Sequence, residues 1–386
     1  MLLKFHVKIK NKAKYIINRM LSNKWVFTKF ENIQDHINKK INLYPNESFH
    51  YVQEHANPSD LYYYQTEKSI YILENVVVWP HYSVVATKNK SLVKDSAYSH
   101  HRFKYFVEND NLKKYRIIKE NEPCTAIEIG HWSNYYHWFV DSVPRLYALH
   151  HPEIQRLKSI KLYLSDNISS DYVDIIKKLI PSNVEIIYKS HNSRILAKSY
   201  IHLPYLTTDW AGHLPKDYIE FYRWSIYSLY DLSPKTFKRN NNIFITRKNA
   251  DCRKIINEEE LYPMLQKKGF SVHQLEKMKL KDQIALFVDA NAIIGQHGAG
   301  LTNMLYSENA TVIELFSTNY PGLYHYRLLA SSLGHTYGNI YIKNIFRPDE
   351  LQVPWRIKYT PKVVNNDVVV DVREIENKIN EMIKIR

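Results

Sequence analysis

The sequence predicts an α/β protein with two domains. Three observations support this prediction. The chain has 386 residues, which is more than one hydrophobic core usually serves. Strand-like apolar segments alternate with helical ones, which is typical of parallel sheets with helical crossovers. A glycine-rich turn, Gly295–Gly300, follows an apolar strand, as in doubly wound sheets.

Residues 1–40 form a basic leader. Eight lysines and arginines precede the first acidic residue, Glu31, and are interleaved with apolar residues. A basic amphipathic segment of this kind can lie on an anionic membrane surface, so residues 1–30 are a candidate for such attachment. A solvated tail, or a helix packed on the protein itself, would show the same pattern.

Residues 41–215 are expected to form the first α/β domain. Its predicted strands are 69–73, 76–79, 125–129, 161–164, 184–188 and 199–203. Helices are expected at 136–149 and 171–179. Pro144 predicts a kink or a new helix start inside the first of them.

Residues 216–350 are expected to form the second, doubly wound domain. A long helix at 216–233 precedes it and carries aromatic residues that we expect in a core rather than in a ligand platform. These are Tyr218, Phe221, Tyr222, Trp224, Tyr227 and Tyr230. Strands follow at 242–246, 271–275, 292–295 and 311–316, with helices at 257–268, 281–289 and 299–306. Asn257 and Glu260 suggest a capping box. In the tail, 351–386, a helix from Val370 is expected to pack back on the first domain.

The glycine-rich turn is a candidate anion site. A helix start gathers unpaired N–H groups and partial positive charge, and Gly298 and Gly300 allow close backbone approach. Arg247, Lys248 and Arg253 follow the predicted strand 242–246, one β–α–β unit before this turn. Their positive charges suit the binding of a diphosphate. His297 can donate to a phosphate or a sugar hydroxyl, and Glu314 can accept from ribose hydroxyls. A solvated basic loop, a structural histidine and a strand-end salt bridge are the alternatives.

A second polar cluster spans His131 to Leu146. If this segment is helical, His137 and Asp141 share one face, and Arg145 continues it. This arrangement suits general-base catalysis, with Asp141 as the first candidate for the base and His137 as the second. The candidate acceptor-binding residues are His131, Asn134, Tyr136 and Arg145. A buried polar network that stabilises the helix is the alternative.

The sequence predicts no metal site. The chain contains no Asp-x-Asp pair, no His-x-x-x-His and no Cys-x-x-Cys. We therefore expect a mechanism without metal or other cofactor, in which arginine, lysine and helix N–H groups neutralise a leaving diphosphate.

Four segments resemble glycosyltransferase family 61 in content and order, over about residues 120–320. They are Tyr136-His137-Trp138-x-x-Asp141-x-x-Pro144-Arg145-Leu146, Ile245-Thr246-Arg247 with Arg253, Asp282-Gln283, and Gly295-x-His297-Gly298-Ala299-Gly300-Leu301-Thr302-Asn303 with Val312-Ile313-Glu314-Leu315.

The resemblance implies a GT-B architecture, in which two Rossmann-like domains face a central cleft. It implies inverting transfer of a sugar from a nucleotide sugar, usually a UDP-sugar, to a glycan hydroxyl. The donor would then bind the second domain. Its expected contacts are Arg247, Lys248, Arg253, Gln283, His297, Gly298, Ala299, Gly300, Leu301, Asn303 and Glu314. The chain looks most like bacterial members that build capsules and other surface polysaccharides.

Composition weighs against other classes. The net charge of +14 suits an anionic partner, but the basic residues gather in the leader and no nucleic-acid-binding module appears, so no nucleic acid is expected. A nucleotide-sugar-modifying enzyme of the epimerase type remains the alternative enzyme. The lack of an 18-residue apolar run or a signal peptide, with only two cysteines, predicts a cytoplasmic protein, peripheral to the membrane at most.

Overall fold

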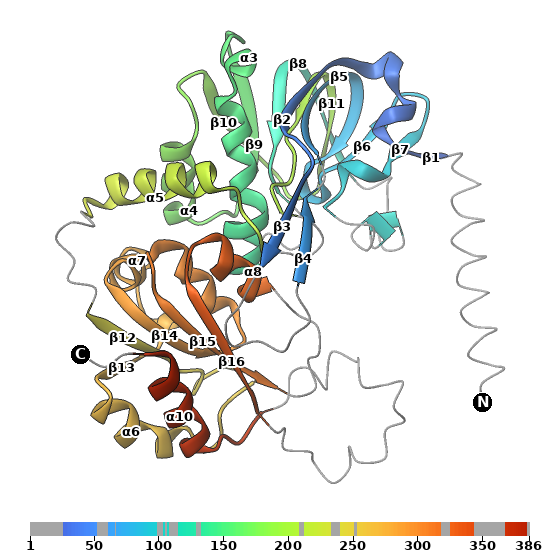
Figure 1. Cartoon of the computed structure of the whole chain (residues 1–386). Coiled ribbons are helices and arrows are strands. Elements are labelled where there is room, and N and C mark those ends of the chain that lie inside the picture. Colours follow the sequence, from blue (N-terminus) through green and yellow to red (C-terminus); the bar gives the residue numbers. More distant parts are fainter. Residues whose placement is uncertain are drawn as a thin grey trace, which may run out of the picture. The chain divides into compact units, whose positions relative to one another are not determined.

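The computed structural model describes residues 26–51, 61–65, 67–98, 103–104, 106–107, 115–128, 133–207, 212–232, 240–250, 253–317, 325–342 and 367–383. The chain forms two compact units, whose boundaries fall after Glu47, Tyr64 and Asp209 (Figure 1). Strands and helices alternate in both units, which confirms the predicted α/β class. Most of the predicted basic leader, residues 1–25, lies outside the described residues, so its attachment to a membrane stays a prediction.

The described part of the first unit contains a nine-stranded mixed sheet. Its order is β1-β7-β6-β5-β11-β8-β9-β10, and β2 also pairs with β5. The strands are β1 (Val26–Thr28), β2 (Ile37–Tyr44), β5 (Lys68–Trp79), β6 (Val84–Thr87), β7 (Ser91–Val93), β8 (Arg116–Ala126), β9 (Ile160–Ser165), β10 (Val184–Lys189) and β11 (Ser193–His202). Four neighbours, β11, β8, β9 and β10, are parallel. Strands β1 and β7 are also parallel. The expectation of a parallel sheet is wrong for the pairs that β5 forms with β2, β6 and β11 and for the pair β6–β7, which are antiparallel.

Strand β5 replaces the two strands predicted at 69–73 and 76–79. The chain passes through Asn75, whose φ is 54°, without leaving the sheet. The same neighbour, β11, pairs with residues on both sides of Asn75, so one long strand results. Shorter elements complete this unit: η1 (Phe30–Asn32), η2 (Gln34–His36), η3 (Pro80–Tyr82) and η4 (Lys94–Ser96). The strand pair β3 (Glu47–Tyr51) and β4 (Leu61–Gln65) lies almost entirely in the second unit.

The crossover from β8 to β9 changes helix type at a proline. The π-helix η5 (His137–Ser142) runs directly into the 3₁₀-helix η6 (Val143–His150), and α3 (Pro152–Gln155) follows. Pro144 has no N–H to donate to the preceding turn, so the hydrogen-bond pattern must change there. This confirms the predicted new helix start. The next crossover is α4 (Ser170–Leu179), which Ser169 caps at its N-terminus.

A buried ion pair joins the carboxyl ends of three parallel strands in this unit. Glu128 lies just beyond β8, Ser165 ends β9 and Lys189 ends β10. The Glu128 carboxylate lies 3.1 Å from the Lys189 amine, and both side chains are fully buried. Ser165 donates to this carboxylate through its backbone N–H and its hydroxyl. The pair fixes the relative positions of the strand ends.

The second unit contains a parallel five-stranded sheet in the order β13-β12-β14-β15-β16. The strands are β12 (Asn241–Ile245), β13 (Phe270–His273), β14 (Ala290–Gln296), β15 (Thr311–Ser317) and β16 (Thr336–Ile342). The helices are α5 (Lys216–Tyr230), η7 (Glu258–Leu261), α6 (Tyr262–Lys267), η8 (Leu275–Lys277), α7 (Leu280–Val288), η9 (Ala299–Tyr306), α8 (His325–Ser332) and α10 (Val372–Met382). Helices α6 and α10 cover one face of the sheet, and α7 and α8 cover the other (Figure 1). This confirms the predicted doubly wound pattern for the second domain.

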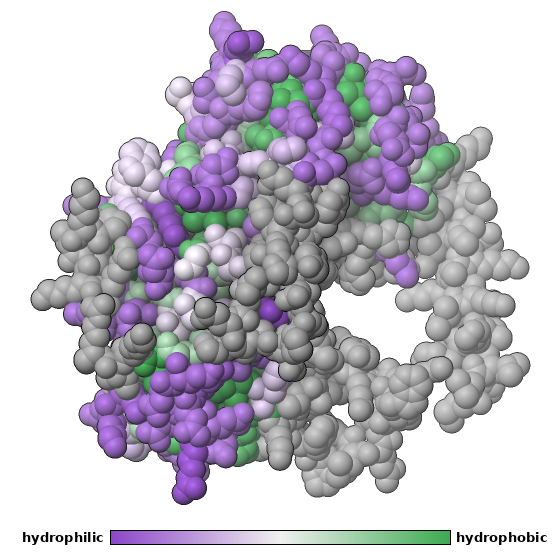
Figure 2. Space-filling model, viewed as in Figure 1, coloured by the Kyte–Doolittle hydropathy of each residue, from purple (hydrophilic) through white to green (hydrophobic). Residues whose placement is uncertain are grey.

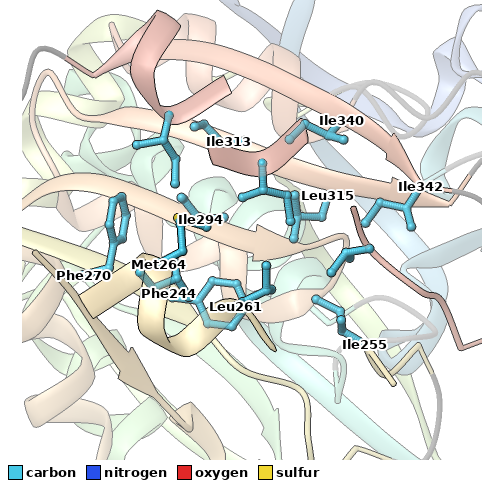
Figure 3. Close-up of a cluster of buried hydrophobic side chains, with 14 of the residues drawn as sticks. Phe244, Ile255, Leu261, Met264, Phe270, Ile294, Ile313, Leu315, Ile340 and Ile342 are labelled. Carbon is cyan, nitrogen blue, oxygen red and sulfur yellow. The ribbon is translucent and has the colours of Figure 1, made fainter. Parts of the chain in front are cut away.

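Helix α10 packs on the second unit's own core. Its Ile375 and Ile379 join the strand residues and the residues of α6 that Figure 3 shows. Gly338 of β16 has α10 so close that an added methyl group would collide with Met382. The expectation that the terminal helix packs back on the first domain is therefore wrong. Its apolar stripe is buried by the strands that precede it.

The predicted capping box at Asn257 is also wrong. The Asn257 amide donates to Glu260 at 3.0 Å, but no side chain caps the helix start. Instead, the Asn257 amide exchanges two hydrogen bonds of 3.0 Å with the backbone of Val370. This side chain ties the segment before α10 to the start of η7.

On the face that Figure 2 shows, the described surface is mostly hydrophilic, with hydrophobic residues in separate small patches. None of the helices described here is both long enough and apolar enough to span a membrane.

We predict that the second unit loses stability in acid through His335. This buried imidazole accepts from the Ala310 N–H at 3.1 Å and donates to the Met304 carbonyl at 3.0 Å. Burial lowers its pKa from 6.5 to about 4. Between these values the unfolded chain binds the proton and the folded chain does not, so stability falls as the pH drops from about 6.5 to 4, by about 2–3 kcal/mol at pH 4.5.

The measurement is urea unfolding of the protein and of His335→Gln at pH 7 and pH 4.5. Glutamine can make both hydrogen bonds without titrating, so the variant should lose less stability between the two pH values. Equal losses in the two proteins would contradict this role of His335.

Candidate functional site

The strand order of the second unit places two predicted motifs side by side. In chain order the sheet reads 2-1-3-4-5, so the order reverses between β12 and β14. Ligands of doubly wound sheets bind at such a switch point, beyond the carboxyl ends of the strands. Arg247 follows β12 there, and His297 and Gly298 follow β14. The structure thus brings together the basic loop and the glycine-rich turn.

The Arg247 side chain lies directly against this turn. A Cβ atom built on Gly298 would stand 2.6 Å from a terminal nitrogen of Arg247. Gly298 is extended, with φ 173° and ψ 166°, so its backbone accepts any residue. What requires glycine here is the close approach of the guanidinium group.

Arg253 reaches the same turn from the other end of the loop. Its guanidinium donates to the His297 carbonyl at 2.9 Å, from a residue whose φ is 59°. Burial raises the pKa of the Tyr326 hydroxyl, and both Arg253 and Arg247 oppose this rise. Two cationic side chains therefore lie at the same turn at the switch point, which suits a ligand with two or more negative charges.

Glu314 holds His297 in place. The His297 Nδ1 atom donates to one carboxylate oxygen at 2.5 Å, and the Tyr337 hydroxyl donates to the other at 2.5 Å. Glu314 is only 1% exposed. The carboxylate therefore orients the imidazole. Because it is buried, it does not fit the predicted role of accepting hydrogen bonds from ribose hydroxyls. Tyr337 is a residue that the sequence analysis missed.

Other residues that were predicted to bind the sugar donor form the structural frame of the site instead. Asn303 is buried and donates to Gln283 at 2.9 Å, and Gln283 donates to the Leu275 and Met278 carbonyls. Together they lock η9 to α7. Leu301 is buried, and Gly300 lies against the side chains of Leu275 and Ile245.

Two predicted donor residues stand outside this frame. Ala299 is the first residue of η9 and is partly exposed. The exposed Lys248 turns to Glu259, at 2.6 Å.

In the first unit, His137 and Asp141 form a buried pair. The His137 Nδ1 atom lies 2.7 Å from Asp141 Oδ2. Both residues lie in η5, and π-helical turns often occur at functional sites. An ionised carboxylate can only accept, so Nδ1 carries a proton, and Nε2 carries the lone pair whenever the imidazole is neutral. The predicted shared face is confirmed.

Asp141 accepts two further hydrogen bonds from distant segments. The Thr207 hydroxyl donates to Oδ1 at 2.6 Å and the Tyr98 hydroxyl at 3.0 Å. Asp141 is 1% exposed, whereas His137 is 7% exposed. Neither of these hydrogen-bond donors could be identified from the sequence, because no local pattern links them to η5. Lys68, whose pKa burial lowers to about 8, donates to the Thr207 carbonyl at 3.4 Å.

Arg145 contacts the segment that leads to Thr207, one of the partners of Asp141. Its guanidinium is fully buried, donates twice to the Leu203 carbonyl, at 2.8 and 3.1 Å, and lies 4.3 Å above the Tyr205 ring. It holds the segment that carries Thr207. Its burial does not fit the predicted contact with an acceptor.

The remaining predicted acceptor residues lie at the start of η5. The Asn134 side-chain oxygen accepts hydrogen bonds from the N–H groups of Tyr136 and His137, at 2.9 and 3.4 Å, and so caps the N-terminus of the helix. Tyr136 is buried, with its ring 5.5 Å from that of His137. His131 lies outside the described residues. Within the described segments, no three His, Cys, Asp or Glu side chains are grouped as metal ligands.

Residues 135–313 match the model of the family described as Glycosyltransferase 61. The match confirms the resemblance that the motifs of this segment indicate, and it contains η5, β12, β14 and the turn between β14 and η9. It relates this segment to glycosyltransferases.

Two characterised proteins are similar to part of the chain. The β-1,2-xylosyltransferase of Arabidopsis thaliana is 32% identical over 105 residues, which are 24% of this chain and 20% of the relative. The EGF domain-specific O-linked N-acetylglucosamine transferase of Drosophila melanogaster is 33% identical over 76 residues, 19% of this chain and 15% of the relative. The aligned stretches thus span a fifth or less of these relatives' lengths.

We predict that the donors to Asp141 stabilise the first unit measurably. Tyr98→Phe removes a hydrogen bond to a buried carboxylate and should lower the free energy of unfolding by about 1.5–3 kcal/mol. Tyr205→Phe is the matched control, because its hydroxyl donates to a neutral acceptor, the Ser96 carbonyl at 3.2 Å. That variant should lose only about 0.5–1.5 kcal/mol. Urea unfolding of both variants tests the difference, and equal losses would argue against a charged acceptor at Asp141.

Proposed function

We propose that this protein is a glycosyltransferase that moves a sugar from a nucleotide sugar to a hydroxyl of a glycan. The nucleotide that we propose is UDP. The observation that carries the proposal is the meeting of Arg247, Arg253 and the His297–Gly298 turn at the switch point of the second sheet. The family match includes all of these residues. The similarity to transferases of xylose and N-acetylglucosamine supports a sugar as the group transferred.

The donor's diphosphate would be bound by the two guanidinium groups and the turn. Arginine binds phosphate oxygens in bidentate fashion, and its charge neutralises the diphosphate as it leaves. These groups are all on the second unit, so we assign donor binding to that unit. With cations already in place, the reaction does not need a metal ion to neutralise the leaving group.

We propose His137 as the general base, with Asp141 as the residue that orients it. Asp141 is nearly inaccessible and already accepts from His137, Tyr98 and Thr207. In the reaction, Nε2 of His137 takes the proton of the acceptor hydroxyl. The hydroxyl oxygen forms a bond to the anomeric carbon as the bond to the diphosphate oxygen breaks, which inverts the configuration and releases UDP.

We also propose a GT-B arrangement of the two units, which the α/β build of each unit supports. A role in bacterial surface polysaccharide synthesis remains a prediction from the sequence resemblance alone. A nucleotide-sugar-modifying enzyme is the alternative, and it would form product without any acceptor.

We predict selective binding of UDP that depends on the contact between Arg247 and Gly298. Saturating UDP, at 100 times its dissociation constant, should stabilise the protein by about 2.7 kcal/mol, more than ADP, GDP or CMP, with or without EDTA. Gly298→Ala should displace the flexible guanidinium at little cost in stability. The loss of a charge-assisted bond would weaken UDP binding by about 10- to 100-fold.

The control is a double-mutant cycle read by titration calorimetry. In an Arg247→Ala background, Gly298→Ala should have no further effect on UDP affinity, because the group that it displaces is gone. Additive losses would show that the two residues act separately. No thermal shift with any nucleotide would sink the donor-site proposal.

We predict that His137→Gln lowers the turnover number by about 10²–10⁴-fold, the usual contribution of a general base. UDP affinity should stay unchanged, because His137 lies in the first unit. Turnover is measured as the rate at which UDP is released from the UDP-sugar that the binding experiments identify. Asp141→Asn should also lower turnover, since it disturbs the orientation of the imidazole. If His137→Gln stays active while Asp141→Asn is inactive, Asp141 is the base instead.

A further inference from the structure

The second unit has a pocket that none of the chemistry above uses. It has a volume of about 670 Å³ and lies along the C-terminal half of α5. Its lining includes Glu220, Trp224, Tyr227, Ser228, Glu308 and Asn309. The first four residues come from α5, and the last two lie between η9 and β15.

The pocket lies at the opposite edge of the sheet from the candidate donor site. Gly298 stands at the start of η9, beyond the carboxyl end of β14, whereas Glu308 and Asn309 follow the end of η9 and precede the amino end of β15. Eight residues of 3₁₀-helix separate the two places by about 16 Å, at about 2.0 Å per residue. A ligand of this pocket therefore does not overlap the donor.

Trp224 is the unusual residue of this pocket. Two tyrosines of α5, Tyr218 and Tyr222, are only 1% exposed and lie in the core, as the sequence predicts. Trp224 is 69% exposed, so the expectation that it lies in a core is wrong. An indole left in contact with water is a favourable stacking surface, because a ligand that covers it regains the cost of its exposure. Glu220 and Ser228 lie one turn before and after it on the same helix face.

Apart from Trp224, Tyr227 and Leu232, the lining is polar, and its charges nearly balance. Glu220 lies 3.8 Å from Lys216. The Arg223 guanidinium, also part of the lining, donates to the Leu305 and Ser307 carbonyls and forms a fixed wall. Two carboxylates against these cations do not favour a phosphate or sulfate, and the fixed cation does not favour an amine. The chemistry suits a neutral ligand with an apolar face and many hydroxyl groups.

We propose that this pocket binds a neutral oligosaccharide, whose ring stacks on Trp224 while its hydroxyls bond to Glu220, Glu308 and Asn309. The site would hold a glycan chain away from the reacting sugar. It goes beyond the proposed transfer activity, and a binding measurement tests it without any need for turnover.

The test is binding of the full chain to an immobilised panel of neutral oligosaccharides, uronic-acid oligosaccharides and amine-bearing chitosan oligomers. The protein should bind members of the neutral set. Trp224→Ala should weaken this binding about tenfold or more, whereas Trp224→Phe, which keeps an aromatic ring, should weaken it less. Tyr188→Ala is the matched control, because Tyr188 is 53% exposed on β10 and lies outside the pocket.

Each outcome decides the proposal. Neutral binding that Trp224→Ala abolishes, with the UDP thermal shift unchanged, supports it. Neutral binding that ignores Trp224, or binding of the chitosan or uronic-acid oligomers alone, overturns it. A wild-type protein that shows the UDP shift but binds no glycan also overturns it and leaves the proposed transfer function standing. Should Trp224→Ala fail to fold, protection of Trp224 from N-bromosuccinimide oxidation by the bound neutral oligosaccharide gives the same decision.

Discussion

Buried carboxylates impose the constraint on which both units depend. An ionised oxygen withdrawn from water is costly unless the protein supplies donors or a cation. The Glu128 carboxylate pairs with the Lys189 amine and accepts from the Ser165 hydroxyl. The Asp141 carboxylate accepts hydrogen bonds from a histidine and two hydroxyl groups. Glu314 receives a histidine and a tyrosine. In each case the donors come from different elements, so satisfying one charge also fixes how several elements lie together.

The same constraint explains why the candidate site could be found in part from the sequence. The pair His137 and Asp141 is local, four residues apart, and the helical pattern places both on one face. Their partners Tyr98 and Thr207 are 43 and 66 residues from Asp141. A chain with 31 tyrosines offers no reason to choose Tyr98. Local spacing therefore identifies the pair but cannot show that Asp141 is saturated with donors, which is what favours His137 as the base.

Fold prediction divides along a similar line. The second unit follows the alternation of strand and helix closely, because each strand of its parallel sheet needs a crossover helix that the pattern reveals. Within the described residues, no crossover helix joins the antiparallel strands of the first sheet. Strand β5 looks like two strands, since Asn75 interrupts its apolar run, and only pairing with β11 unites them. The packing of α10 likewise depends on Gly338, whose missing side chain no periodicity can interpret.

Strand order is the step that turns two weak motifs into one site. Arg247 and Gly298 are separated by six strand or helix segments in the chain, and neither a basic loop nor a glycine turn is specific alone. In a sheet ordered 2-1-3-4-5, β12 and β14 are neighbours, and the reversal of winding leaves a crevice at their carboxyl ends. The turn must then be narrow enough for a guanidinium to lie against it, which explains glycine at a position whose backbone does not demand it. Topology and side-chain size together therefore account for a pattern that composition leaves ambiguous.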